Sequence, residues 1–161
     1  MGSSQKINDW EVVADKLKEW RSKKEKIVFT NGCFDILHLG HIDYLEKARS
    51  LGNRLIIGLN TDRSVTKLKG TGRPLYQQEA RARILAALEF VDVVIMFDQE
   101  TPYDLINHIK PDILVKGNDY LSENIVGADI VKSKGGKVVT INLVEGYSTS
   151  ALIEKINRLN K

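Results

Sequence analysis

Five short runs rich in valine, isoleucine and leucine divide the chain, and stretches with the apolar spacing of helices lie between them. The runs occupy residues 27–30, 55–59, 91–97, 112–115 and 138–141. Short, continuous apolar runs are typical of parallel strands that are buried on both faces. Their alternation with helices predicts an α/β protein with a single doubly wound, five-stranded parallel sheet and right-handed crossovers.

Apolar residues three and four positions apart predict the helices. These helices cover residues 9–23, 40–50, 77–90, 124–134 and 149–161. Thr101 and Pro102 are typical of a further helix start, and Gly52 is typical of a left-handed helix end. We therefore expect residues 1–25 to form a helix that packs on one domain of residues 26–161.

Composition narrows the class of protein. The chain has 161 residues, 42% of them hydrophobic, which suits one globular domain. A single cysteine, Cys33, rules out an intramolecular disulfide, and neither a signal peptide nor a long apolar span is present. We therefore expect a cytoplasmic protein with no membrane partner. The net charge of +3 is too small to indicate nucleic acid but suits a phosphorylated small ligand.

The loops after the strands carry the candidate chemistry, because doubly wound sheets bind ligands at the carboxyl ends of their strands. NGCFDILHLGH follows the first strand, NTDRSVTKLKGTGRP the second, KGNDY the fourth and VEGYSTS the fifth. His38 and His41 stand at a predicted helix start, where the helix dipole attracts anions. Gly32 and Gly40 would let a ligand approach the backbone. The loop therefore predicts a phosphate site with two imidazole donors.

Other interpretations of this loop remain. Histidines at this spacing also occur in packing and capping roles, and together with Cys33 and Asp35 they form a candidate metal set. The spacing Cys-x4-His-x2-His is irregular for zinc, however. Neither a Walker G-x4-G-K-[ST] motif nor a G-x-G-x-x-G fingerprint is present. We interpret Asp35 as orienting the loop or capping the helix, and Cys33 as a small hydrophobic side chain.

FTNGCFDILHLGH resembles the signature of the HxGH nucleotidylyltransferase superfamily, and the similarity extends over residues 26–156. The segments SVTKLKGTGRP, VDVVIMFDQETPYDLINHIKPDILVKGNDY and EGYSTSALIEKI are most similar to the D-glycero-β-D-manno-heptose 1-phosphate adenylyltransferases, in their stand-alone form without a sugar-kinase half. The resemblance implies a Rossmann-like nucleotidylyltransferase fold. It also implies transfer of AMP from ATP to the heptose phosphate, giving ADP-heptose for lipopolysaccharide or related glycan precursors, with Mg²⁺ bound to the triphosphate.

The resemblance also implies roles for individual residues. The implied catalytic residues are His38, His41 and Lys69. The implied nucleotide-binding residues are Phe29, Thr30, Asn31, Gly32, Gly40, Lys116, Gly117, Ser148, Thr149 and Ser150. The implied substrate-binding residues are Asn60, Asp62, Arg73, Asp119 and Tyr120, and no protein side chain is assigned to a metal. Asn118 replaces a glycine of the family's usual KGGDY, and asparagine tolerates positive φ better than most residues.

Each of these assignments has a structural alternative. Lys69 and Arg73 also suit a solvated surface, and KGND suits a surface turn. The hydroxyls of residues 148–150 are common helix N-caps, as are Asn60 and Asp62.

Two other functions stay open. One is a cytidylyltransferase acting on glycerol 3-phosphate or another alcohol phosphate, although Leu143 stands where such enzymes often carry an arginine. The other is a nucleotide-binding module without catalysis. Relatives commonly form homodimers, and we expect the apolar face of the helix between Trp10 and Trp20 to be one possible dimer contact.

Overall fold

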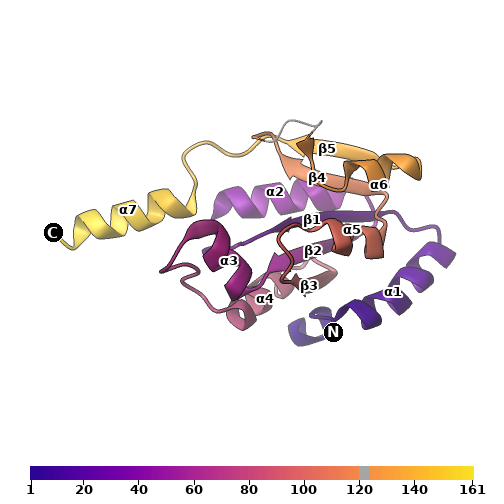
Figure 1. Ribbon diagram of the computed structural model, residues 1–161, viewed down its shortest axis with the longest axis horizontal. Helices are drawn as coiled ribbons and strands as arrows, with labels where there is room; N and C mark the ends of the chain where they lie inside the picture. The colour runs from indigo at the N-terminus through magenta and orange to yellow at the C-terminus, as the bar shows by residue number, and fades with distance from the viewer. Residues whose placement is uncertain (120–123) are drawn as a thin grey trace.

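The computed structural model describes residues 1–119 and 124–161, and the centre of this described part is a sheet of five parallel strands (Figure 1). The strands are β1 (Ile27–Gly32), β2 (Arg54–Asn60), β3 (Val93–Phe97), β4 (Ile113–Gly117) and β5 (Lys137–Ile141). Their order is β3-β2-β1-β4-β5, and every adjacent pair is parallel. The predicted sheet is confirmed, and its strand order reverses between β1 and β4.

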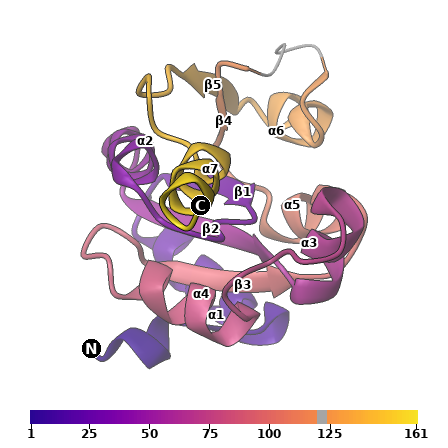
Figure 2. The same cartoon turned by 90° about the vertical axis from the view of Figure 1, so that its left-hand side faces the viewer.

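Helices cover both faces of the sheet. They are α1 (Trp10–Ser22), α2 (Leu39–Ser50), α3 (Asp62–Lys69), α4 (Gln78–Ala86), α5 (Tyr103–Ile109), α6 (Ala128–Ser133) and α7 (Thr149–Leu159), after a 3-10 turn, η1 (Ser3–Lys6). One core lies between the sheet and α1, α5 and α6, and a second lies between the sheet and α2 and α4. Figure 2 shows α2 and α5 on opposite sides of β1. Along β1, Val28 faces one core and Phe29 the other, because successive side chains of a strand alternate.

Several helix boundaries differ from the prediction. α5 begins at Tyr103, with Pro102 as its N-cap at a ψ of 10°. α6 begins at Ala128 rather than at residue 124, because Gly127 has a φ of 85° that no helix interior accommodates. α4 ends at Ala86, four residues before the predicted end.

Gly52 does not adopt the predicted left-handed conformation, so that prediction is wrong. A Cβ atom at this position would lie 2.7 Å from the Val28 side chain and 2.9 Å from the carbonyl oxygen of Lys26. The glycine is therefore explained by the close approach of the loop to β1.

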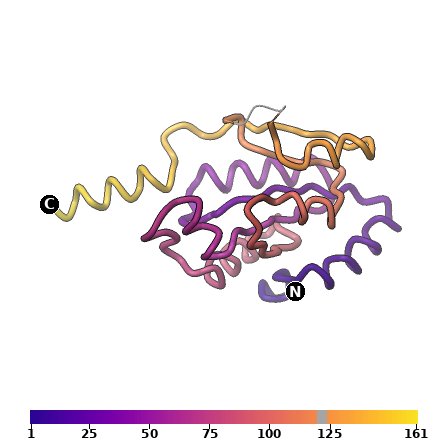
Figure 3. The backbone as a smooth tube through the Cα atoms, viewed as in Figure 1, coloured from indigo at the N-terminus to yellow at the C-terminus, as the bar shows by residue number. Residues whose placement is uncertain are grey.

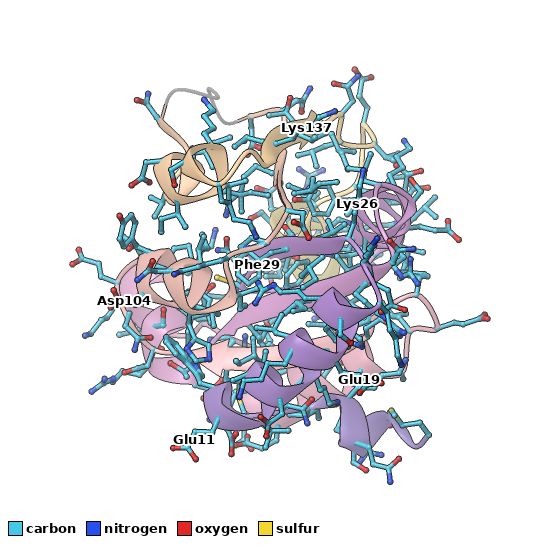
Figure 4. All side chains as sticks on the ribbon, turned by 90° about the vertical axis from the view of Figure 1, so that its right-hand side faces the viewer. Glu11, Glu19, Lys26, Phe29, Asp104 and Lys137 are labelled. Carbon is cyan, nitrogen blue, oxygen red and sulfur yellow. The ribbon has the colours of Figure 1, made fainter. Side chains whose placement is uncertain are left out.

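The apolar face of α1 is buried within its own domain. Val13, Leu17 and Trp20 are at most 7% exposed and belong to the core beneath β1, β2 and β3. Figure 4 shows Glu11 at the outer edge of the molecule; Glu11 and Glu19 are both exposed, whereas Phe29 is fully buried. This face is not open to a second chain, so the expected dimer contact there is wrong. Within the described residues, no helix combines the length and apolarity needed to cross a bilayer.

Candidate active site

A cavity of about 690 Å³ lies at the carboxyl ends of β1, β2 and β4. This is the position where doubly wound sheets bind ligands. Its walls include most of the site residues expected from the sequence: Asn31, Gly32, His38, Gly40, His41, Asn60, Lys69, Arg73, Lys116, Gly117, Asp119, Ser148, Thr149 and Ser150. The structure therefore brings together loops that follow four different strands.

Three expected site residues lie elsewhere, and a fourth falls outside the described residues. Phe29 is fully buried in the core, and the Thr30 hydroxyl lies 2.8 Å from the Tyr44 hydroxyl. Asp62 pairs with an arginine on α4, and none of these three lines the cavity. Tyr120 is the residue that the structure does not describe.

The two histidines stack on each other at the start of α2. His38 is the N-cap, and its ring centroid lies 3.8 Å from that of His41, with 27° between the planes. The backbone N–H of His38 donates to Nδ1 of His41 at 3.3 Å. Because Nδ1 accepts a hydrogen bond, the proton of the neutral His41 ring lies on Nε2.

Burial keeps both imidazoles neutral. It lowers the pKa of His41 to about 4, with a smaller contribution from the neighbouring His38, and it also lowers the pKa of His38. The hydrogen bond from the His38 backbone acts in the same direction, since protonated Nδ1 could not accept it. Both rings can therefore donate one hydrogen bond each to an anion without carrying a charge beforehand.

Asp35 orients the loop that contains the histidines, which is one of the two roles expected from the sequence. Its carboxylate is 3% exposed and accepts hydrogen bonds from the backbone N–H groups of Leu75 and Tyr76, at 2.9 and 3.0 Å. Arg73 Nε donates to it at 2.8 Å. Burial alone would raise the pKa of Asp35, but these hydrogen bonds outweigh burial and hold the pKa below its usual value. Arg73 lines the cavity and at the same time ties its own loop to Asp35.

Two lysines contribute positive charge to the cavity from different depths. Lys69 ends α3 and is exposed. Lys116 is buried at the end of β4, and its ammonium donates to the side-chain oxygen of Asn31 on β1. Burial lowers the pKa of Lys116 to about 8, against an opposing effect of Asp119.

The remaining loop residues have structural roles as well. Ser148 is the N-cap of α7 and accepts from the Ala151 N–H at 3.0 Å, so its capping role is observed. Burial raises the pKa of the Cys33 thiol, which keeps it protonated at neutral pH.

Asn118 has an ordinary φ and donates to Asn142, so the turn does not require a glycine there. Among the described residues, no group of three His, Cys, Asp or Glu side chains is arranged to hold a metal ion.

Arg81 is a further residue that holds the site together, and it was not among the residues expected from the sequence. This α4 side chain is 1% exposed and donates to the carbonyl oxygens of Cys33 and Asn60, at 2.7 and 2.8 Å. It also pairs with the Asp62 carboxylate at 2.7 Å. Arg81 thus joins the histidine loop, the end of β2 and the start of α3. The sequence does hold one sign of this role. Arg81 lies on the same helix face as the apolar residues Ala82 and Leu85, where a charged side chain is unusual.

Comparison with curated proteins identifies similar chains. The chain is 51% identical over 154 residues to the bifunctional protein HldE of Magnetococcus marinus, and 54% identical over 151 residues to that of Methylobacillus flagellatus. These matches cover 96% and 94% of this chain but only 32% and 31% of the relatives. The chain thus spans about a third of the length of the curated relatives that it matches.

Solved structures share the fold. A lipopolysaccharide core biosynthesis protein from Thermoplasma volcanium is 28% identical, with a TM-score of 0.60 over 77% of this chain and 99% of that one. A pantoate-beta-alanine ligase from Francisella tularensis has a TM-score of 0.58 over 95% of this chain and 77% of that one, at 18% identity, which is evidence of fold alone. The model of the cytidylyltransferase-like family matches residues 29–155. With that match over most of its length, and with the histidine pair in place at the end of β1, the chain belongs to the cytidylyltransferase-like family.

Proposed function

We propose that the chain is an adenylyltransferase that joins AMP from ATP to D-glycero-β-D-manno-heptose 1-phosphate, giving ADP-heptose and pyrophosphate. The observation that carries this proposal is the stacked histidine pair in a cavity that also holds Lys69 and Lys116. The resemblance of the loop motifs to the heptose phosphate enzymes supports the choice of substrates. The similarity to bifunctional HldE proteins and to a lipopolysaccharide core biosynthesis protein agrees with it.

The proposed reaction is an in-line displacement at the α-phosphorus of ATP. A phosphate oxygen of the sugar phosphate forms the new P–O bond, and the bond from the α-phosphorus to its β-bridging oxygen breaks. Pyrophosphate leaves with the electron pair of that bond. A phosphate dianion is a competent nucleophile at neutral pH, so the residues need only position the reactants and stabilise charge.

The histidines and Lys69 are assigned the task of stabilising that charge. Nε2–H of His41 and a ring N–H of His38 would donate to phosphate oxygens, and the flexible Lys69 ammonium would follow the leaving pyrophosphate. Such donors act most strongly where water is scarce, and His41 is partly buried. Mg²⁺ bound to the triphosphate would neutralise part of its charge.

The test is pyrophosphate release in the presence of Mg²⁺, with ATP and CTP each paired with heptose 1-phosphate and with glycerol 3-phosphate. We expect release only with ATP and the heptose phosphate. Release with CTP and glycerol 3-phosphate would contradict the proposal in favour of a cytidylyltransferase, although Leu143, rather than an arginine, lines the cavity. Nucleotide binding without release in any pairing would favour a module without catalysis. The cytoplasmic location and the homodimer stay predictions.

A further inference from the structure

Tyr147 extends the histidine stack from a distant part of the chain. It lies in the loop between β5 and α7, and its ring centroid is 6.3 Å from that of His38, with 24° between the planes. On the other side of the stack, Phe34 meets His41 edge to face, with the centroids 5.4 Å apart. Phe34, His41, His38 and Tyr147 thus form a continuous arrangement of rings, which we call the aromatic column. The separations of 5.4 and 6.3 Å lie in the range of favourable aromatic pairs, and the two histidine rings are closer still.

Two further contacts hold the Tyr147 segment against the histidine loop. The Thr149 hydroxyl donates to the carbonyl oxygen of Ile36 at 3.2 Å. A Cβ atom at Gly40 would lie 3.0 Å from the His38 ring and 3.3 Å from Cβ of Tyr147. The absence of a side chain at Gly40 therefore makes room for both residues, which is a reason for this glycine besides ligand approach.

The ring of His38 depends on these neighbours for its orientation. Its Nδ1 atom is buried and has no hydrogen-bond partner among the described residues. A histidine that acts as a donor is usually oriented by a hydrogen bond to its other ring nitrogen. Here the rings next to His38 are those of His41 and Tyr147, so the ring contacts take over the task of orienting it.

We propose that Tyr147 is a positioning residue, whose ring holds His38 against His41 in the orientation from which it donates to phosphate. The effect on catalysis rests on the proposed function, whereas the contact with His38 can be measured without any substrate. The exposed fraction of Tyr147 is 48%, so its ring is replaceable without opening the core.

The experiment compares Tyr147→Leu and Tyr147→Phe with Tyr103→Leu, a control in which a similarly exposed tyrosine on α5, outside the cavity lining, is replaced. The chain has three histidines, so their imidazole NMR signals can be followed one by one during a pH titration. In Tyr147→Leu we expect the His38 signal to move and its pKa to rise toward the ordinary value, because one covering ring is lost. The signal of His108, which packs on Trp10 rather than on Tyr147, should keep its chemical shift. Tyr147→Phe and Tyr103→Leu should match the wild type.

Steady-state kinetics complete the test. We expect Tyr147→Leu to lower kcat by about three- to ten-fold, the equivalent of one aromatic pair, with a smaller change in KM for ATP. An unchanged His38 signal in Tyr147→Leu would overturn the proposal, and so would an equal loss of kcat in Tyr147→Phe. If the wild type itself transfers no AMP, the proposed function fails, and the NMR titration still decides whether Tyr147 positions His38.

Discussion

His41 is the residue on which the proposed chemistry depends most. Its Nδ1 atom is occupied by the backbone N–H of His38, which leaves Nε2–H as its donor. Its ring lies between His38 and Phe34 in the aromatic column. Phe34 adopts a φ of 44°, a left-handed conformation that is costly for a residue with a side chain, so the surrounding contacts hold the loop in a strained form.

Replacing His41 by alanine should lower kcat by about a hundred- to a thousand-fold, the usual cost of losing one donor to a developing negative charge. The fold should remain intact, because His41 is only partly buried and belongs to neither hydrophobic core. Circular dichroism would verify the fold alongside the rate measurement. Near-normal turnover by His41→Ala would rule out its assigned role.

Because the pKa of His41 is low, the free energy of unfolding should depend on pH. An unfolded histidine binds a proton near pH 6.5, whereas folded His41 does so only near pH 4. Its contribution to stability is therefore complete above pH 6.5 and is lost as the pH falls toward 4. Urea unfolding of wild type and His41→Gln should show a smaller loss of stability between pH 7 and pH 5 in the variant. Identical losses in both proteins would show that His41 is not buried as a neutral ring.

At the level of elements, α3 carries Lys69 to the cavity between two ion pairs. Arg81 pairs with Asp62 at the first residue of α3, and Arg73 pairs with Asp35 just after its last. Arg81 and Asp35 are buried, so the start of α3 is fixed to the end of β2 and the loop that follows α3 is fixed to the histidine loop. The position of Lys69 relative to the histidines follows from these two pairs.

Removing Arg81 tests this arrangement. Arg81→Met should lower the free energy of unfolding by about 3 kcal/mol, because Asp62 loses its partner and two carbonyl groups lose their donor. Arg83→Met on the exposed side of the same helix should change the value by no more than about 0.5 kcal/mol. Urea denaturation measures both, and equal losses in the two variants would contradict the role of Arg81.

The sequence predicted those elements and residues whose signal is local. The strands follow from continuous apolar runs, and the histidine loop follows from a short motif at the end of β1. Arg81 and Tyr147 escaped prediction, because their roles come from contacts with residues far away in the chain. The start of α6 was misplaced, since the left-handed conformation of Gly127 appears only in the folded backbone.

On the scale of the whole molecule, α7 is packed much less tightly than the sheet and the helices that cover it. α7 projects away from the sheet and carries the C-terminus to the far end of the molecule (Figures 1 and 3). None of its residues is buried, although Leu152, Ile156 and Leu159 are apolar. The helix is therefore attached to the body mainly through the contacts of the loop and N-cap that precede it.

A matched pair of substitutions measures this difference. Ile106→Ala, at a fully buried site on α5, should cost about 2–5 kcal/mol of folding free energy. Ile156→Ala, at a position 52% exposed on α7, should cost no more than about 0.5 kcal/mol. Both values come from urea denaturation at low protein concentration. A cost at Ile156 as large as that at Ile106 would contradict the placement of α7.

The most direct test of the proposed function follows the α-phosphorus of ATP. Protein, Mg²⁺ and D-glycero-β-D-manno-heptose 1-phosphate are incubated with ATP labelled at that atom, and the products are separated. The proposed mechanism predicts that the label appears in ADP-heptose and that one pyrophosphate is released for each product formed. Label that stays in ATP, or that appears only as free AMP whether or not the sugar phosphate is present, would contradict adenylyl transfer.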